Sequence, residues 1–436
     1  MDKAALKAKV LEIIDQEAEK IISIGNQIFD NPELGFKEHA TAAVVKQTFE
    51  ELQLPHEAEI AITGLRAELA GRKQDLKVAV MGELDAVLCY DHPKAHPETG
   101  ATHACGHNAQ IAGMLGAAIG LVKAGAAEHL DGSIVFLAVP AEEFVELEYR
   151  NRLREEGKIE FFGGKQEFIR LGVFDDIDIS IMFHSESDCP GRRVMVGGSS
   201  NGFIGKSIRY IGREAHAGGA PFEGINALNA ALLGLMGIHA QRETFRDEDH
   251  IRVHPIITRG GDLVNIVPAD VRLETYVRGR TLEAILDANR KVNRALLAGA
   301  DAVGAEIEIG EIPGYLPLRN DPNLSEIFRQ NASDVIGAEN VGDWGGMGGS
   351  TDMGDVTHLI PGIHPAVGGI KGTAHTRNFL VSDPDAAYIV PAKVMALTVI
   401  DLLYEGAELA RKVKQEFKPA MTKDEYLKMW RDLVAK

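Results

Sequence analysis

The chain has 436 residues, which at roughly 150 residues per domain predicts two or three domains, and its 45% hydrophobic and 25% charged residues are typical of an ordinary folded protein. Acidic residues outnumber basic ones by 64 to 46 and give a formal net charge of −18, which argues against nucleic acid as a partner because the phosphate backbone needs a basic surface. The three cysteines are an odd number in a long chain, so a disulfide framework is not expected and a reducing compartment is favoured.

The first part of the chain alternates helix-like and strand-like segments. Apolar side chains recur at helical spacing or in short buried runs, which predicts helices over 3–29, 38–53 and 109–124 and strands over 76–81, 133–140 and 177–183. Strands that alternate with helices are typical of an α/β fold in which much of the sheet is parallel.

Each of the three predicted strands is followed by a carboxylate or a histidine. The first runs into Glu83 and Asp85, the second into Glu142 and Glu143, and the third into His184. Ligands of open α/β sheets bind beyond the carboxyl ends of the strands. The sequence therefore predicts a site formed by these side chains.

Residues 199–311 have a different order of elements. A strand-like segment is followed by a helix over 224–240, two strand candidates, a helix over 281–299 and a final strand. This β-α-β-β-α-β order is the ferredoxin-like pattern. We therefore predict one domain formed by 1–198 and 312–436 and a smaller domain, 199–311, inserted into it.

The strongest local signal is the segment Thr102–Asn108, THACGHN, which places Cys105 and His107 at the start of the predicted apolar helix. A helix N-terminus favours a thiolate, and thiolate and imidazole are both ligands of Zn²⁺. A buried cysteine beside a surface histidine would have the same pattern, because a metal site needs a complete ligand set.

Further residues are available to complete such a set. Adjacent carboxylates at Glu142 and Glu143 would repel each other if buried unpaired, and a metal would relieve this by taking one and leaving the other as a base. An exposed acidic loop is the alternative for that pair, and a structural role is the alternative for His184 and His375. With the cysteine and histidine of the helix start, these residues make a reasonable ligand set for Zn²⁺ or Mn²⁺.

A nucleophilic Cys105–His107 dyad is the competing chemical interpretation. Residues two apart rarely present both side chains to one point, and no third orienting group is evident, so the metal site is favoured. No Gly-x-Ser-x-Gly turn, phosphate-binding loop or dinucleotide-binding glycine motif occurs in a suitable context.

Taken together, the motifs resemble the metallopeptidase and amidohydrolase family that includes hippurate hydrolase, plant indole-acetyl-amino-acid hydrolases, aminoacylase and p-aminobenzoyl-glutamate hydrolase. The resemblance covers nearly the whole chain and rests on IFDNPELGFKEHAT (28–41), GELDAV (82–87), THACGHN (102–108), VPAEEF (139–144), GREAHAGGAPFEGINALNAA (212–231), GGDLVNIVPADV (260–271), GSTDMGDVTHLIPGIHP (349–365) and GTAHTRNF (372–379). Within this family, CGHN (105–108), STDMGDV (350–356) and PGIHP (361–365) resemble the branch that contains p-aminobenzoyl-glutamate hydrolase and related dipeptidases. The resemblance implies a zinc-peptidase-like catalytic α/β domain with an inserted ferredoxin-like α+β domain that serves as a lid or in dimerisation.

The resemblance also implies roles for individual residues. Carried over position by position, it places ligands of one or two divalent ions, Zn²⁺ or Mn²⁺, at Cys105, His107, Glu143, His184 and His375. It implies that Glu142 is the general base and that His216 and Asn265 contact the substrate or stabilise the oxyanion. Arg278 is a weaker candidate for holding a substrate carboxylate.

The sequence departs from the family pattern around the implied ligands. Asn108 stands where many members have aspartate, and Gln110 stands where they have histidine. The family's Asp-Met-Asp motif is Glu83-Leu84-Asp85 here. These differences leave the implied ligands in place and bear on the contacts around them.

The expected reaction is hydrolysis of the amide bond of an N-acyl, N-aminoacyl or N-aminobenzoyl amino acid by a metal-activated water, with Glu142 as general base. A dipeptidase or a carbamoyl-amide hydrolase on the same scaffold is the alternative within enzymes. A non-catalytic metal- or ligand-binding protein is a further alternative, against which the spare carboxylate beside Glu143 argues.

The expected partners are a small-molecule substrate and a second copy of the chain, bound through the inserted domain, with neither nucleic acid nor a membrane. The charged N-terminal residues lack the apolar core of a signal peptide. The most apolar stretch, Ile111–Val122, is too short to span a bilayer. The cytoplasm is therefore the expected location.

Overall fold

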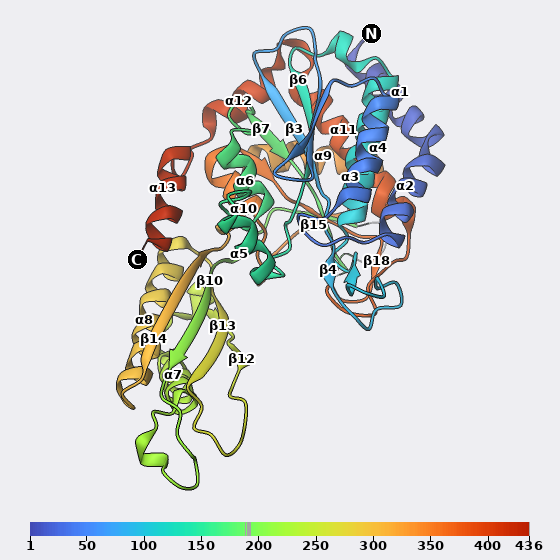
Figure 1. The fold of residues 1–436 in the computed structure, drawn as a ribbon. Helices are drawn as coiled ribbons and strands as arrows, with labels where there is room; N and C mark the ends of the chain where they lie inside the picture. The colour runs from blue at the N-terminus through green and yellow to red at the C-terminus, as the bar shows by residue number, and fades with distance from the viewer. Residues whose placement is uncertain (188, 190–192, 436) are drawn as a thin grey trace. The chain divides into compact units, whose positions relative to one another are not determined.

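The computed structural model describes residues 1–187, 189 and 193–435, and the chain forms two compact units (Figure 1). The first unit consists of Met1–Ser199, Arg319–Gly346 and Asp355–Lys423. The second consists of Ser200–Leu318, Met347–Gly354 and Asp424–Lys436. The chain thus leaves the first unit after Ser199 and returns to it at Arg319.

A six-stranded sheet forms the centre of the first unit, in the order β1-β2-β6-β3-β7-β16. Its strands are β1 (His56–Ile60), β2 (Gly64–Leu69), β3 (Lys77–Glu83), β6 (Ser133–Val139), β7 (Ile179–Ile181) and β16 (Gly362–Ile363). β1, β2 and β6 pair antiparallel, whereas β6, β3, β7 and β16 run parallel. β6 is buried throughout and β3 nearly so, as expected for parallel strands covered on both faces. The predicted α/β fold with parallel pairing is confirmed.

Helices cover this sheet and pack on one another (Figure 1). Helix α4 packs against β3 and is itself packed by α1, α2 and α11. The helices of this unit are α1 (Lys3–Gln16), α2 (Ala18–Asp30), α3 (His39–Glu51), α4 (His107–Lys123), α5 (Leu147–Glu155), α6 (Gly164–Leu171), α9 (Pro322–Ile336), α10 (Met353–Leu359, which starts in the second unit), α11 (Val390–Leu403) and α12 (Glu408–Glu416).

The prediction of one continuous helix over 3–29 is wrong. Helix α1 ends at Gln16 and α2 begins at Ala18, because Glu17 between them leaves the helical conformation with φ −94° and ψ 6°. The buried side chains of the two helices continue a helical spacing across the break. Hydrophobic periodicity alone therefore does not reveal it.

Short strands organise the loops beyond the main sheet. One small sheet has the order β15-β9-β17-β8 and consists of β8 (His184–Ser185), β9 (Val194–Val196), β15 (Val341–Asp343) and β17 (Ala366–Val367). Two hairpins are formed by β4 (Val87–Leu88) with β5 (Ala101–Thr102) and by β18 (Ile370–Lys371) with β19 (Leu380–Val381). His184 lies in β8, and His375 lies in the loop between β18 and β19.

The core of the first unit is built from α1, α2, α4, α11 and the inner strands. One helical stretch of the described residues, Asp385–Leu403, is long and apolar enough to cross a membrane. The most apolar part of this stretch is 89% buried within the fold, so packing in a protein core accounts for its apolar character.

The second unit is an antiparallel sheet with two helices that pack on it. Its strands and helices are β10 (Gly202–Ile211), α7 (Ala227–Ala240), β11 (Arg252–Val253), β12 (Ile256–Arg259), β13 (Asp270–Gly279), α8 (Leu282–Asp301), β14 (Glu306–Pro313) and, from its second residue, α13 (Lys423–Val434). Buried and less buried residues alternate along β13, so one face of the sheet packs against α7 and α8. β11 and β12 both pair with β13, which gives the β-α-β-β-α-β order of a ferredoxin-like unit.

Gly116 in α4 allows three helices of the first unit to pack closely. A Cβ at this position would lie 2.8 Å from the Cβ of Ala392 in α11 and 3.2 Å from Ile21 in α2. Gly116→Ala should therefore destabilise the fold by about 1–3 kcal/mol through overpacking, partly offset by better helix propensity. Denaturant unfolding of the two proteins measures the difference. Gly342→Ala, where a Cβ would meet nothing within 4 Å, is the control, and an equal loss there would contradict the packing argument.

Candidate metal centre

The parallel strands of the first unit bring polar side chains to one edge of the sheet. β3 ends at Glu83, and its neighbour in register, Val139, ends β6. The segment after β6 carries Glu142 and Glu143, and the segment after β7 leads into His184 in β8. Because the carboxyl ends of parallel strands meet at one edge, all these side chains come together there and are buried.

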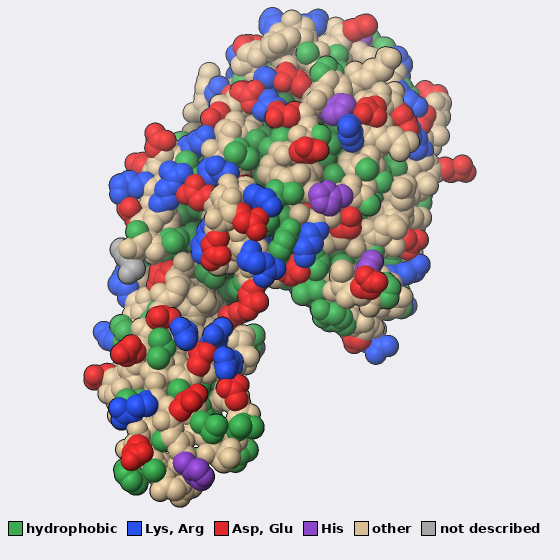
Figure 2. All heavy atoms as spheres, viewed as in Figure 1, with side chains coloured by type: hydrophobic (Ala, Val, Ile, Leu, Met, Phe, Trp, Pro, Cys, Tyr) green, Lys and Arg blue, Asp and Glu red, His purple; other side chains and the backbone are tan. Residues whose placement is uncertain are grey.

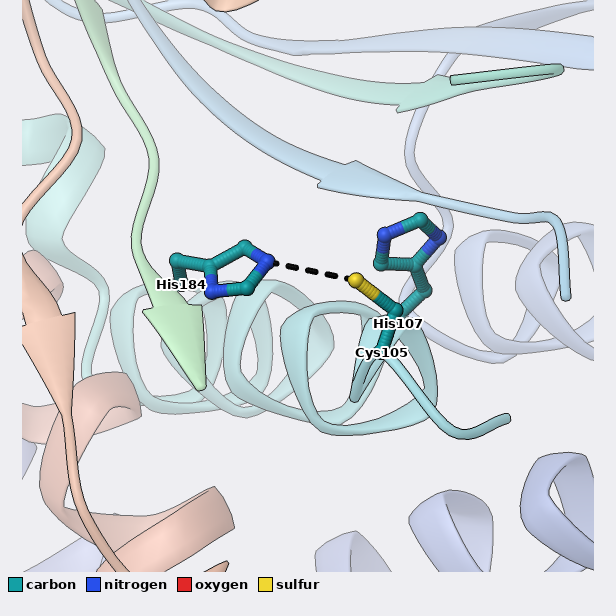
Figure 3. Close-up of side chains that lie close together, drawn as sticks. All are labelled: Cys105, His107 and His184. Carbon is teal, nitrogen blue, oxygen red and sulfur yellow. Dashed lines mark hydrogen bonds between the residues drawn. The ribbon is translucent and has the colours of Figure 1, made fainter. Parts of the chain in front are cut away.

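Cys105 lies at the centre of one group of possible ligands (Figure 3). Its Sγ lies 3.4 Å from His184 Nε2 and 3.4 Å from His375 Nε2. His375 Nε2 is also 3.2 Å from Glu143 Oε1. In Figure 3 the ring of His107 lies on the side of the sulfur away from His184. Ligand atoms of Cys105, Glu143 and His375 all lie within 4.8 Å of one another, as do those of Cys105, His107 and His184, which is close enough to share an ion.

The start of α4 holds Cys105 close to β8. Gly106 caps this helix with φ 88°, and a Cβ on it would lie 2.6 Å from the Cβ of Ser185. Glycine is needed there both for the left-handed backbone and for the close approach. Burial and Glu143 raise the pKa of Cys105, but His184 and His107 lower it by more, to about 6. Most of the sulfur is therefore thiolate at neutral pH, the form that binds metal.

Glu83, His107 and Glu142 form a second group, whose ligand atoms also lie within 4.8 Å of one another. His107 Nε2 is 3.1 Å from Glu83 Oε2 and 3.9 Å from Glu142 Oε2. His107 Nδ1 is 2.8 Å from Asp85 O and 3.2 Å from Asp85 Oδ1. Both Asp85 atoms are acceptors, so Nδ1 carries a hydrogen and Nε2 is the nitrogen that faces the carboxylates.

Asp85 connects the two groups. Its Oδ2 accepts a hydrogen bond of 2.9 Å from the backbone N–H of Glu143, while its Oδ1 and backbone oxygen face His107 Nδ1. One carboxylate therefore orients a ligand of each group, which is a common arrangement around protein-bound metals.

The charges of this cluster fit a bound cation. Glu83 Oε2, Glu143 Oε1 and His107 Nε2 are buried and make no hydrogen bond of suitable geometry among the described residues, although each has an ionisable neighbour within 3.2 Å. Burial lowers the pKa of His107, but Glu83 and Cys105 raise it well above its usual value. Glu143 likewise raises the pKa of His375, to about 12. The surplus of anions thus holds protons on these imidazoles, and a divalent ion in the same place would supply that positive charge instead.

Lys165, on α6, supplies a fixed positive charge beside the cluster. Its Nζ donates to Glu83 Oε1, and both side chains are fully buried. Burial raises the pKa of Glu83, but Lys165 and His107 lower it well below its usual range. Glu83 is therefore a carboxylate that keeps its second oxygen towards His107.

Sequence reasoning placed Glu83 and Asp85 at the site, because they follow the end of a strand, but it gave neither of them a specific role. It missed Lys165 altogether. Lys165 carries no such signal, because lysine in a short polar helix is usually exposed and only the packing of α6 turns it inward.

Two of the departures from the family pattern, Asn108 and Gln110, make hydrogen bonds that hold the start of α4. Asn108 Nδ2 donates to Gly25 O at 3.2 Å and to the Tyr388 hydroxyl at 3.0 Å. Gln110 Oε1 accepts from the backbone N–H of Glu83 at 3.1 Å. These bonds tie α4 to α2 and to the end of β3.

The second unit holds His216 and Asn265 on neighbouring exposed loops. The N–H of Ala217 donates to the backbone oxygen of Asn265 at 2.9 Å. His216 Nδ1 accepts from the N–H groups of Gly218 and Gly219, at 3.2 and 2.9 Å. A neutral His216 therefore has its hydrogen on Nε2, and this nitrogen is a donor.

Arg278 lies apart from that pair, at the far end of β13. Its Nη1 donates to Ser350 Oγ at 2.7 Å, and its guanidinium lies 5.1 Å from the ring centre of Phe203 and 5.2 Å from that of Tyr276. The eight residue steps from Asp270 to Arg278 span about 25 Å of strand, so within this unit Arg278 does not share a site with Asn265.

Comparison with known proteins shows where the chain belongs. Residues 79–401, well over half of the chain, match Peptidase family M20/M25/M40. The chain is 28% identical to the Xaa-Arg dipeptidase of Mus musculus over 97% of this chain and 94% of the relative. It is 26% identical to hippurate hydrolase of Campylobacter jejuni over 76% of this chain and 80% of the relative.

Solved structures share the fold. A dinuclear metal-binding peptidase of the M20 family from Bacillus subtilis is 22% identical with a TM-score of 0.68, over 89% of this chain and 99% of that chain. An aminobenzoyl-glutamate utilization protein from Klebsiella pneumoniae is 18% identical with a TM-score of 0.68, over 89% of this chain and 97% of that chain. With the cluster of thiolate, imidazole and carboxylate ligands, these matches show that the chain belongs to Peptidase family M20/M25/M40 and is a metal-dependent enzyme acting on C–N amide bonds.

Proposed function

We propose that this enzyme hydrolyses the amide bond of an N-acyl, N-aminoacyl or N-aminobenzoyl amino acid, with Glu142 as general base. The observation that carries the proposal is the pair of buried carboxylates after β6: Glu143 faces His375 and Cys105, whereas Glu142 faces His107. One carboxylate is thus available to bind an ion and the other to move a proton. One or two divalent ions, Zn²⁺ or Mn²⁺, would supply Lewis-acid chemistry by polarising the carbonyl and lowering the pKa of water.

Each protein group has a separate task in this reaction. Glu142 takes the proton of the attacking water and delivers it to the leaving nitrogen. The proposed ligands that hold the ions are Cys105, His107, Glu143, His184 and His375. His216 donates from Nε2 to the oxyanion, and Asn265 contacts the substrate from the neighbouring loop. Arg278 is the weaker candidate for the substrate carboxylate, because its guanidinium is already engaged by Ser350.

A dipeptidase activity is the second candidate. It is supported by the similarity to the Xaa-Arg dipeptidases of Mus musculus and Homo sapiens, which extends over 97% of this chain. The chemistry is the same, since a dipeptide is an N-aminoacyl amino acid. A panel of N-acyl amino acids, dipeptides and carbamoyl compounds separates the two candidates by their kcat/KM values.

We also propose that the enzyme is a homodimer through its second unit and that it works in the cytoplasm. Large apolar side chains are exposed on α7 and on the edge strand β12: Leu232, Leu233, Met236, Ile256 and Ile257. In Figure 2 hydrophobic side chains are visible on the surface of this unit among the charged ones. An exposed helix face and an open sheet edge favour pairing with a second copy by two-fold symmetry. Cys89 and Cys105, which form no disulfide, suit a reducing compartment.

Removal of metal should abolish hydrolysis, and added Zn²⁺ or Mn²⁺ should restore it. Elemental analysis and turnover of the best substrate in the panel measure both effects. Cys105→Ser should lose metal, whereas Cys89→Ala, a change at another buried thiol, should retain it. Undiminished activity after exhaustive chelation, with no metal detected, would instead favour Cys105 as a nucleophile.

Glu142→Gln should lower kcat by about 10²–10⁴-fold, the usual contribution of a general base, and should still bind metal. Glu143→Gln should lose metal, because it removes the charge of a proposed ligand. Turnover and metal content are measured on both variants. If both kept their metal and only Glu143→Gln were inactive, the two roles would be reversed.

His216 should act on the active site of the partner subunit. Glu142→Gln and His216→Ala should each be nearly inactive alone. After subunit exchange, a hybrid dimer holds one site with both native residues, so about a quarter of the native activity should return when half of the dimers are hybrids. Differently tagged subunits verify that exchange has taken place. If subunits exchange but no activity returns, His216 acts within its own chain or not at all.

A further inference from the structure

The loop that carries Glu142 and Glu143 begins with a strained residue. Ala141 has φ 52°, a left-handed conformation that residues with a Cβ rarely adopt. It is completely buried, directly after β6 and Pro140. Surrounding groups must therefore hold this backbone in place.

Arg150, on α5, spans the loop with its guanidinium. Nη2 donates to the backbone oxygen of Glu143. Nη1 donates to Phe162 O at 2.5 Å and, in a longer contact of 3.4 Å, to Ala141 O. The carbonyls of Ala141 and Glu143 are those on either side of Glu142, so one side chain ties down both flanks of the proposed base.

Stability alone does not account for an arginine at this position. Arg150 is 1% exposed, and within the described part of the chain no carboxylate lies at ion-pair distance from it. Its charge faces backbone oxygens and the ring of Phe36, whose centre is 5.4 Å away. A buried cation without a counter-charge is costly, and an apolar side chain of similar volume would avoid that cost.

Glu38 holds the other side of Ala141. Its Oε1 accepts from the Ala141 N–H at 2.8 Å, and its Oε2 accepts from Thr63 Oγ1 at 2.6 Å. The Ala141 oxygen also accepts from the N–H of Gly164 at 3.2 Å. Ala141 is thus fixed at both its N–H and its C=O, the latter in part by Arg150.

Gly35 provides the space through which Arg150 reaches the loop. A Cβ at Gly35 would lie 2.5 Å from Arg150 Nη2 and 2.9 Å from the Cα of Ala141. A side chain at Gly35 would therefore press on both the guanidinium and Ala141 while Arg150 remains in the protein.

We propose that Arg150 is a positioning residue of the reaction, which fixes the backbone on both sides of Glu142 so that this carboxylate faces the metal cluster. The inference rests on the proposed role of Glu142 as general base. Arg150 donates its hydrogen bonds to backbone oxygens and to no side chain of a proposed metal ligand. It therefore acts on the loop through the backbone.

Arg150→Ala should lower kcat by about 10²-fold, the effect of a misplaced catalytic group, with KM changed less than about threefold. Arg150→Lys should not recover the loss, because one ammonium does not span two carbonyls. Leu153→Ala is the matched control: it removes a buried side chain of the same helix that makes none of these hydrogen bonds, and it should lower thermal stability while leaving kcat near the native value.

A double-mutant cycle tests whether Arg150 acts through Glu142. In a Glu142→Gln background, Arg150→Ala should cause little further loss of kcat, because the group that it positions is already inactive. Gly35→Ala provides the same test in a protein that keeps Arg150, and it serves if Arg150→Ala does not fold.

The inference is overturned if the double variant loses kcat by the product of the two single losses, if Leu153→Ala reduces kcat as strongly as Arg150→Ala, or if a folded Arg150→Ala keeps native kcat. If Arg150→Ala does not fold, native kcat in Gly35→Ala overturns it. The proposed function fails separately, namely if Glu142→Gln itself keeps native kcat. In that case a loss in Arg150→Ala would have to arise from another group of the loop.

Discussion

The site depends on the convergence of negative charge at the carboxyl edge of a buried parallel sheet. β3 and the segments after β3 and β6 place Glu83, Asp85, Glu142 and Glu143 there, and the start of α4 adds the thiolate of Cys105. Buried anions of one sign repel each other strongly where water is excluded. The fold is therefore compatible with this arrangement only if positive charge is supplied at the same place.

The protein supplies part of that charge itself. Lys165 is paired with Glu83, and protons are held on His107 and His375 by the neighbouring carboxylates and thiolate. A divalent ion replaces such protons when it binds, which couples metal binding to proton release. Asp85 contacts both ligand groups, through His107 in one and through the backbone N–H of Glu143 in the other.

The loops that carry the proposed ligands contain residues with a left-handed backbone conformation. Gly106, Ala141 and His375 all have left-handed φ values, of 88°, 52° and 61°. Each lies in or beside a ligand loop, and two of the three have a side chain that disfavours this conformation. The compensation comes from specific contacts: the close approach of β8 at Gly106, the Glu38 and Arg150 contacts at Ala141, and the bond from His375 N–H to Ala104 O at 2.8 Å.

The sequence by itself determined the α/β class, the alternation of strands and helices and the ferredoxin-like order of 199–311, because these follow from hydrophobic patterns that are local in the chain. It also pointed to the ends of three strands as the place of a site, since the direction of parallel strands alone brings their ends together. The break at Glu17 could not be predicted in this way, because the apolar spacing continues through it.

Only the tertiary structure decided that Lys165 turns inward to Glu83, that Asp85 contacts both His107 and Glu143, and that Arg150 spans the loop around Glu142. These contacts join residues whose own segments look like ordinary polar helices or strand ends, and their orientation is set by packing against parts of the chain that no local pattern encodes.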